Sequence, residues 1–249
     1  MKSSGFVAGM LAILVLTVAV ASLEAANVNI VASSTDGTAP QQFFIPLDTG
    51  DKIITKDLFD LTGQASFELR DPNNNNLIGT LNALVVSYNL DPVVQVAFGF
   101  KAGAADTTFS ISSGVLDLIP TIRDPRAEGQ AGGTLDINNT SPATVTGNFN
   151  DKALQARYNG ASVFADLLDP LAVSGTTGDI VKSGTDQFPQ PAGTFAAIAG
   201  NVNSMELVFN MDITGGALVT GSGSFEVIPE PASWLLLAFG SLMILRRRR

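Results

Sequence analysis

Asp71, Asn73 and Asn75 place side-chain oxygens at alternate positions and are the candidate metal ligands of this chain. Carboxylate and amide oxygens at this spacing are the ligands that calcium loops use. Two positions depart from such a loop, because Asn76 stands where its glycine belongs and Asn82 stands where a bidentate Glu is required. An Asn-rich turn between two strands is the alternative, since Asn tolerates left-handed backbone. We expect the turn, with calcium as the one cofactor that these residues could hold.

A second pattern, Asp48-Thr49-Gly50, resembles the D-T-G triplet of aspartic proteases, in which two carboxylates share a proton and activate water. The protease pattern requires Ser or Thr at the position that Asp51 occupies, and a second D-T-G triplet does not follow. We therefore interpret these residues as a turn between strands.

The chain contains no histidine and no cysteine. This composition excludes Ser-His-Asp and Cys-His catalysis, imidazole and thiolate metal ligands, and every histidine general base. An enzyme built from this sequence would have to use carboxylates, lysine, hydroxyls or a hard metal ion. We predict no catalytic residues, and the alternative is a secreted carboxylate- or calcium-dependent hydrolase that acts on polysaccharide or peptide.

Aromatic side chains that could support a sugar are scarce. Between residues 27 and 229 there is no tryptophan, and the tyrosines are Tyr88 and Tyr158. Because sugar platforms commonly combine an aromatic face with a polar handle, aromatic lectin activity is disfavoured. Sugar binding through Asn, Asp and Ser side chains in loops stays open. Tyr158 in the Arg157-Tyr158-Asn159-Gly160 turn is the one aromatic candidate, and a structural role for it is the alternative.

Hydrophobic residues alternate with a period of two, which predicts β-strands with one buried face. Residues 84–88 and 93–100 flank an Asn89-Leu90-Asp91-Pro92 turn signal and predict a hairpin. The pattern continues at 109–118 and at 207–213, and residues 218–227 supply a return strand. The fold class that follows is all-β, an antiparallel β-sandwich of the jelly-roll or Ig-like type.

Four segments depart from this pattern. Helical periodicity is confined to two short stretches, Thr55 to Leu61 and Ser162 to Leu168. Two polar stretches, Pro120 to Gly133 and Pro170 to Gly193, are expected to be long loops on the sandwich. Neither marks a domain boundary, so residues 27–228 form one β-rich extracytoplasmic domain.

The charge of this domain restricts its partners. Residues 27–229 contain 21 acidic and 9 basic side chains, so their formal net charge is −12. Such a charge opposes binding to nucleic acid and to anionic lipid surfaces. About two hundred residues suffice to bury roughly 70% of the unfolded chain's surface, so the core can hold the fold without disulfides.

The first 26 residues have the layout of a secretory signal peptide. Lys2 precedes an apolar stretch from Phe6 to Val20, and Ala19-Val20-Ala21 offers a cleavage site between small residues. We expect a signal helix over residues 1–26 that is removed on export.

Residues 229–249 combine three features in a fixed order. Pro229, Glu230 and Pro231 come first, an apolar run from Ala232 to Leu245 follows, and a basic cluster closes the sequence. The run's 14 residues reach about 21 Å as a helix, against a hydrocarbon core of about 30 Å, so we expect a short transmembrane helix. The basic cluster should stay cytoplasmic. The expected anchor residues are Trp234, Leu235, Leu236, Leu237, Phe239, Leu242, Ile244 and Leu245, and the basic stop cluster is Arg246, Arg247, Arg248 and Arg249.

This Pro-Glu-Pro motif, with its Trp-led apolar run and arginine-rich end, resembles the PEP-CTERM sorting signal of bacterial exported proteins. The resemblance implies processing by an exosortase-type membrane protease in a bacterium that has an outer membrane and makes exopolysaccharide. It also implies an exported protein, anchored in the inner membrane as a precursor and later located in the outer envelope or extracellular matrix. We predict a non-catalytic, exopolysaccharide-associated protein. Self-assembly through an open strand edge is a further alternative.

Overall fold

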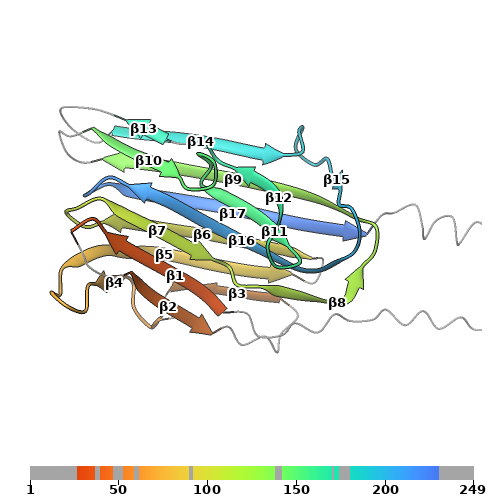
Figure 1. Ribbon diagram of the computed structural model, residues 1–249, viewed down its shortest axis with the longest axis horizontal. Helices are drawn as coiled ribbons and strands as arrows, with labels where there is room; N and C mark the ends of the chain where they lie inside the picture. Colours follow the sequence, from red (N-terminus) through yellow and green to blue (C-terminus); the bar gives the residue numbers. More distant parts are fainter. Residues whose placement is uncertain are drawn as a thin grey trace, which may run out of the picture.

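The computed structural model describes residues 27–36, 40–46, 53–58, 62–89, 92–137, 142–169, 171–173 and 180–229. Strands in these ranges form two antiparallel sheets that lie face to face, so the predicted all-β sandwich is confirmed as a class (Figure 1). Sheet A has nine strands and sheet B has eight.

The main path of sheet A runs in the order β12-β11-β16-β7-β1-β2, and its other strands pair beside β16 or β10. Its strands are β1 (Asn27–Ser34), β2 (Gln41–Pro46), β7 (Thr107–Ser112), β8 (Leu116–Ile122), β10 (Ala143–Gly147), β11 (Leu154–Tyr158), β12 (Ser162–Leu167), β13 (Leu171–Val173) and β16 (Val202–Ile213).

The main path of sheet B runs β14-β9-β17-β6-β5-β3, with β15 beside β9 and β4 beside β5. Its strands are β3 (Ile53–Asp57), β4 (Phe67–Arg70), β5 (Leu77–Asn89), β6 (Val93–Ala102), β9 (Pro125–Ile137), β14 (Ile180–Phe188), β15 (Ala196–Ala197) and β17 (Leu218–Pro229).

The predicted hairpin is confirmed as β5 and β6, which pair from Asn89 and Val93 at the turn to Gly79 and Ala102. The alternating residues of 94–100 and 207–213 all face the core, as expected. The return strand that follows residue 213 is β17, but it does not pair with β16. It crosses to sheet B and lies between β6 and β9, so it becomes a central strand of the other layer.

Phenylalanine rings from both sheets meet in the core. Phe98 of β6 lies 5.0 Å from Phe209 of β16, measured between ring centroids, and 5.3 Å from Phe109 of β7. Phe100 stacks on Phe109 at 4.1 Å. The Phe98 and Phe209 rings occupy the space above β17, whose inward residues at this level are Gly221 and Gly223.

Two stretches expected to be loops are strands instead. The stretch from Pro120 to Gly133 contributes most of β9, and the stretch from Pro170 to Gly193 contains β13 and β14. The inward residues of β9 are mostly Ala and Gly, because Leu167 and Leu168 approach them closely from sheet A. β14 is an edge strand that places Asp186 on its inner side. Neither strand therefore has the large alternating apolar residues by which a strand is recognised.

Both segments predicted to be helical contain strand. Thr55 to Asp57 belong to β3, which pairs with β5, while residues 59–61 lie outside the described ranges. Ser162 to Leu167 form β12, which is the second strand of a hairpin with β11. In these strands cross-strand pairing overrides a weak local helical pattern, whereas Leu58, directly after β3, is helical as predicted.

Adding one methyl group beneath the aromatic rings should destabilise the domain. A Cβ at Gly221 would lie 2.5 Å from Cε1 of Phe98, so we expect Gly221→Ala to lower the free energy of unfolding. Overpacking of this kind costs about 1–3 kcal/mol. Urea unfolding of the full chain in a zwitterionic detergent, followed by circular dichroism, measures the change.

Gly99→Ala on neighbouring β6 is the matched control. A Cβ at Gly99 would find no atom closer than 3.6 Å, so this variant should keep the wild-type stability or gain slightly from reduced unfolded-state entropy. Equal unfolding midpoints for the two variants would contradict the packing argument.

Candidate functional site

The candidate calcium residues form the turn between β4 and β5. The Asp71 carboxylate accepts a hydrogen bond from the Asn73 backbone N–H at 2.8 Å, and the Asn75 N–H donates to the Asp71 carbonyl at 2.8 Å. Asn75 has a φ of 61°, which is the left-handed conformation that Asn tolerates. Among the described residues no three acidic side chains gather as a metal site. Asp71 thus has a structural role in the turn, and calcium binding stays a prediction.

Tyr158, the candidate sugar-binding aromatic, ends β11 and packs against the hydrophobic core. The turn after it uses positive φ at Asn159 and Gly160. The Asn159 side chain donates to the Asn201 carbonyl at 2.7 Å and accepts from the Asn203 N–H at 2.8 Å. These contacts fasten the turn to Asn201 and to the start of β16, so the position of Tyr158 is that of a structural residue.

Tyr88 lies fully inside the sandwich and cannot support a ligand at the surface. Its hydroxyl, on β5 of sheet B, donates to the carbonyl of Ser113, which follows β7 of sheet A. Burial raises the pKa of the Tyr88 phenol, and the nearby Glu206 carboxylate adds to the rise, while the hydrogen bond to Ser113 acts in the opposite direction. The phenol therefore stays neutral and joins the two sheets.

Removing the Tyr88 hydroxyl should weaken this link. We expect Tyr88→Phe to lose about 1–3 kcal/mol of stability, because the Ser113 carbonyl is left without this donor in a buried site. Tyr158→Phe, at the partly exposed tyrosine, is the control and should change stability less.

The raised pKa also gives a pH dependence. The pKa of Tyr88 in the folded protein lies above the unfolded value of about 10. The stability that the neutral phenol contributes is therefore complete below about pH 10 and is lost as the pH rises above it. Chemical unfolding at pH 8 and pH 11 should show a smaller alkaline loss in Tyr88→Phe than in wild type. Equal alkaline losses would show that Tyr88 is not the group responsible.

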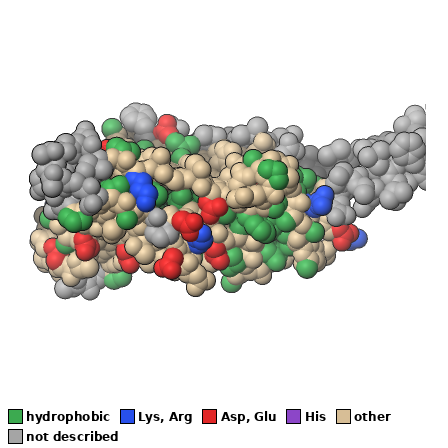
Figure 2. Space-filling view, turned by 90° about the horizontal axis from the view of Figure 1, so that it is seen from above, with side chains coloured by type: hydrophobic (Ala, Val, Ile, Leu, Met, Phe, Trp, Pro, Cys, Tyr) green, Lys and Arg blue, Asp and Glu red, His purple; other side chains and the backbone are tan. Residues whose placement is uncertain are grey.

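A charged cluster fastens the edge strand β14 to sheet A. Lys152 forms an ion pair with Asp169 and lies 3.9 Å from the Asp186 carboxylate, which accepts the Leu168 N–H at 3.1 Å. The hydrogen bond to Asp169 raises the pKa of Lys152. Figure 2, which views the molecule from above the β13 and β14 side of Figure 1, shows acidic and basic side chains side by side near its middle. Since Lys152 is paired with both carboxylates and Asp186 also holds a backbone N–H, we assign this cluster a structural role.

A hollow on the outer face of sheet A has a cavity volume of about 440 Å³ and is lined by two carboxylates, Asp117 and Glu206. Glu206 accepts the Ser112 hydroxyl at 2.5 Å, and Arg157 lines the same hollow. The Arg157 guanidinium also stacks on the Phe149 ring at 5.2 Å. A hydrolase of the predicted alternative type would find its two acids here, and that alternative stays a prediction.

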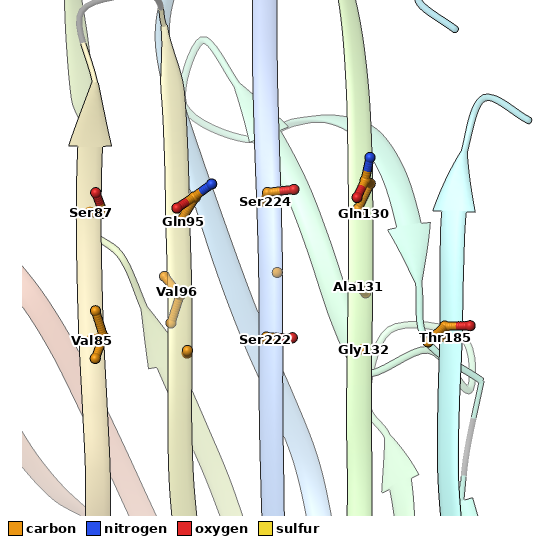
Figure 3. Close-up of a pocket in the computed structure, with 12 residues that line it drawn as sticks. Val85, Ser87, Gln95, Val96, Gln130, Ala131, Gly132, Thr185, Ser222 and Ser224 are labelled. Carbon is orange, nitrogen blue, oxygen red and sulfur yellow. The ribbon is translucent and has the colours of Figure 1, made fainter. Parts of the chain in front are cut away.

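The outer face of sheet B carries a second hollow, with a cavity volume of about 380 Å³. Figure 3 shows Ser87, Gln95, Ser224 and Gln130 at one level on four neighbouring strands, with Val85, Ser222, Gly132 and Thr185 at the next. The Gln130 amide donates to the Glu128 carboxylate at 3.0 Å, which holds this side chain in place. The hollow is therefore lined by hydroxyl and amide groups interspersed with small apolar side chains and glycines, all on paired strands.

Strand register extends this arrangement into three rows that cross β5, β6, β17, β9 and β14, and we call these rows the neutral platform. No member has an ionisable side chain. The rows are Ser87, Gln95, Ser224, Gln130 and Gln187; then Val85, Ala97, Ser222, Gly132 and Thr185; then Ala83, Gly99, Thr220, Thr134 and Ser183.

The sequence analysis missed the neutral platform, although one signal was available. Thr220, Ser222 and Ser224 alternate with inward residues of β17, which marks a strand with a hydroxyl-bearing outer face. The rows themselves depend on which strands are neighbours, and this cannot be read from one strand.

The predicted sorting residues lie at and beyond the end of the described domain. Pro229 is the last residue of β17 and pairs opposite Pro125 of β9. Glu230, Pro231, the anchor residues and the four arginines lie outside the described residues, as do Asp48, Thr49 and Gly50.

Comparison with known proteins does not place the chain in a family. No family model and no curated protein sequence matches it. Among solved structures, it is similar to the enzymatically active domain of tailspike protein 4 from bacteriophage CBA120, with a TM-score of 0.29 and 10% identity. That match covers 81% of this chain and 19% of the tailspike chain. A structure of the infectious bursal disease virus Gx strain gives a TM-score of 0.13 at 10% identity, covering 90% of this chain and 70% of the other. Because these TM-scores are low, neither the fold type nor the activity of these proteins can be assigned to this chain.

Proposed function

We propose that the chain is an exported, non-catalytic protein of the bacterial envelope or extracellular matrix, sorted through Pro229, Glu230 and Pro231. An exosortase-type membrane protease would recognise this motif and process the precursor. The support is the fixed order of the motif, the apolar run and the arginine cluster at residues 229–249. The final location would bring the protein into contact with exopolysaccharide.

The position of the described chain ends is the structural observation that supports this proposal. β17 runs out to one end of the sandwich and stops at Pro229, whereas β1 begins at Asn27, nearer the middle of the long axis (Figure 1). The proposed anchor therefore attaches to the domain at one end. This arrangement suits a precursor that is held at a membrane surface by its C-terminal segment.

The proposal includes two helices, a signal helix in residues 1–26 and a short anchor in residues 232–245, which lie outside the described ranges. Within the described ranges, no helix has the length and hydrophobicity needed to cross a membrane. Assignment of the sandwich to the jelly-roll or Ig-like type also stays a prediction.

Mass spectrometry of the mature protein tests the sorting proposal. We expect envelope or matrix fractions of the producing bacterium to contain protein that lacks at least residues 1–21 and also lacks the arginine cluster. The double variant Glu230→Ala, Pro231→Ala should keep Arg246 to Arg249 and stay in the inner membrane. Pro229 is left unchanged because it belongs to β17.

Glu226→Gln, which removes a carboxylate from β17 before the motif, is the control and should be processed normally. Wild-type protein recovered from the envelope with Met1 and the four terminal arginines in place would refute the proposal.

A further inference from the structure

The neutral platform is an uncharged area on an acidic protein. Its border carries Glu226 and Glu128 at one end and Lys101 and Asp136 at the other, as the register of the central strands shows. Residues 27–229 have a formal net charge of −12. A polyanion would be repelled by this charge, and a cation would find no carboxylate within the platform. Charge complementarity therefore selects a neutral partner.

The shape of the platform selects an extended partner. Ala97, Ser222 and Gly132 form a low middle row, and the longer side chains of Gln95 and Gln130 stand on one side of it. This trough crosses the strands, and the hollow of about 380 Å³ lies along it. On its other side, the Thr134 and Thr220 hydroxyls hydrogen-bond to each other, so this side is also held in place.

A second protein copy fits this face less well. Four strand spacings of about 4.8 Å and two steps of about 6.8 Å between alternate residues span roughly 260 Å² between the outermost Cα atoms. A stable protein interface buries about 800 Å² on each partner. The platform also contains no Trp, Tyr or Arg, the residues that dominate binding energy at protein interfaces.

We propose that the neutral platform binds an extended, uncharged polysaccharide along its middle row. Ser, Thr and Gln side chains each donate and accept hydrogen bonds, as the hydroxyl groups of a sugar do. Because these side chains lie on paired strands, little backbone conformational entropy is lost on binding. The inference deepens the proposed function, on which its biological setting rests, by naming the surface and the class of polymer.

Two charge variants test the proposal in the full-length protein. Ser222→Glu places a carboxylate in the middle row, and Asn203→Glu places the same charge at an exposed position on β16 of sheet A. Affinity electrophoresis in a zwitterionic detergent, with gels containing dextran, laminarin or galactomannan, measures binding to neutral polymers. A gel containing alginate measures binding to a polyanion.

We expect at least one neutral polymer to retard wild type and Asn203→Glu equally. Ser222→Glu should bind that polymer at least about tenfold more weakly, since the new carboxylate must be desolvated. Gln95→Ala with Gln130→Ala should weaken binding in the same direction. Circular dichroism identifies any variant that has failed to fold. If Ser222→Glu does not fold, Ser222→Thr replaces it and tests the effect of added bulk at the same position.

Three results would overturn the inference. These are no retardation by any of the three neutral polymers, tighter binding to alginate than to all of them, or equal binding by wild type and by folded variants of the middle row. Sedimentation that shows a wild-type dimer dissociated by Ser222→Glu would assign the face to a second copy instead.

The sorting proposal can be tested independently of polymer binding. A correctly processed C-terminus without polymer binding would refute only this inference, and polymer binding by a protein that is never processed would refute only the proposed function.

Discussion

The sandwich depends on one contact, the packing of phenylalanine rings on glycines of β17. Phe98 comes from sheet B and Phe209 from sheet A, and their centroids are 5.0 Å apart above Gly221 and Gly223. A Cβ at either glycine would lie within 2.7 Å of a side chain packed against it. Because β17 lies between β6 and β9, this contact fixes both the spacing of the sheets and the position of a central strand. Apolar burial supplies the driving force, and the glycines determine where the rings fit.

The alternation of residues 221–224 in β17 also determines what the outer face of sheet B presents. Gly221 and Gly223 point inward, so Ser222 and Ser224 point outward. A slip of one residue would place serines under the rings and glycines at the surface, which the core packing does not allow. The neutral platform is therefore tied to the aromatic core through the alternation of a single strand. Its neighbours Gln95 and Gln130 are aligned with Ser224 by backbone pairing on either side.

Strands could be predicted from the sequence where large buried side chains alternate with exposed ones. They could not be predicted where the inward residues of a strand are small. The β5–β6 hairpin was predictable because residues 94–100 alternate large apolar side chains around a turn signal. β9 was not, because its inward residues Ala127, Gly129, Ala131 and Gly133 leave room for leucines of sheet A. The calcium-like residues were identified, and so was the turn that explains them. The rows of the platform could not be predicted, since β17, β9 and β14 are distant in sequence from the β5–β6 hairpin and only tertiary packing places them beside it.

The direction of the strands relates the platform to the chain ends. Most strands run roughly along the longest axis of the molecule, and β17 ends at Pro229 at one end of that axis (Figure 1). The outer faces of both sheets therefore lie along the sides of the domain, parallel to the direction in which β17 ends. A segment that held the domain at a membrane would cover its end and leave the platform open at the side. Polymer binding and C-terminal processing would then use separate surfaces, and release from the membrane would require no rearrangement of the sandwich.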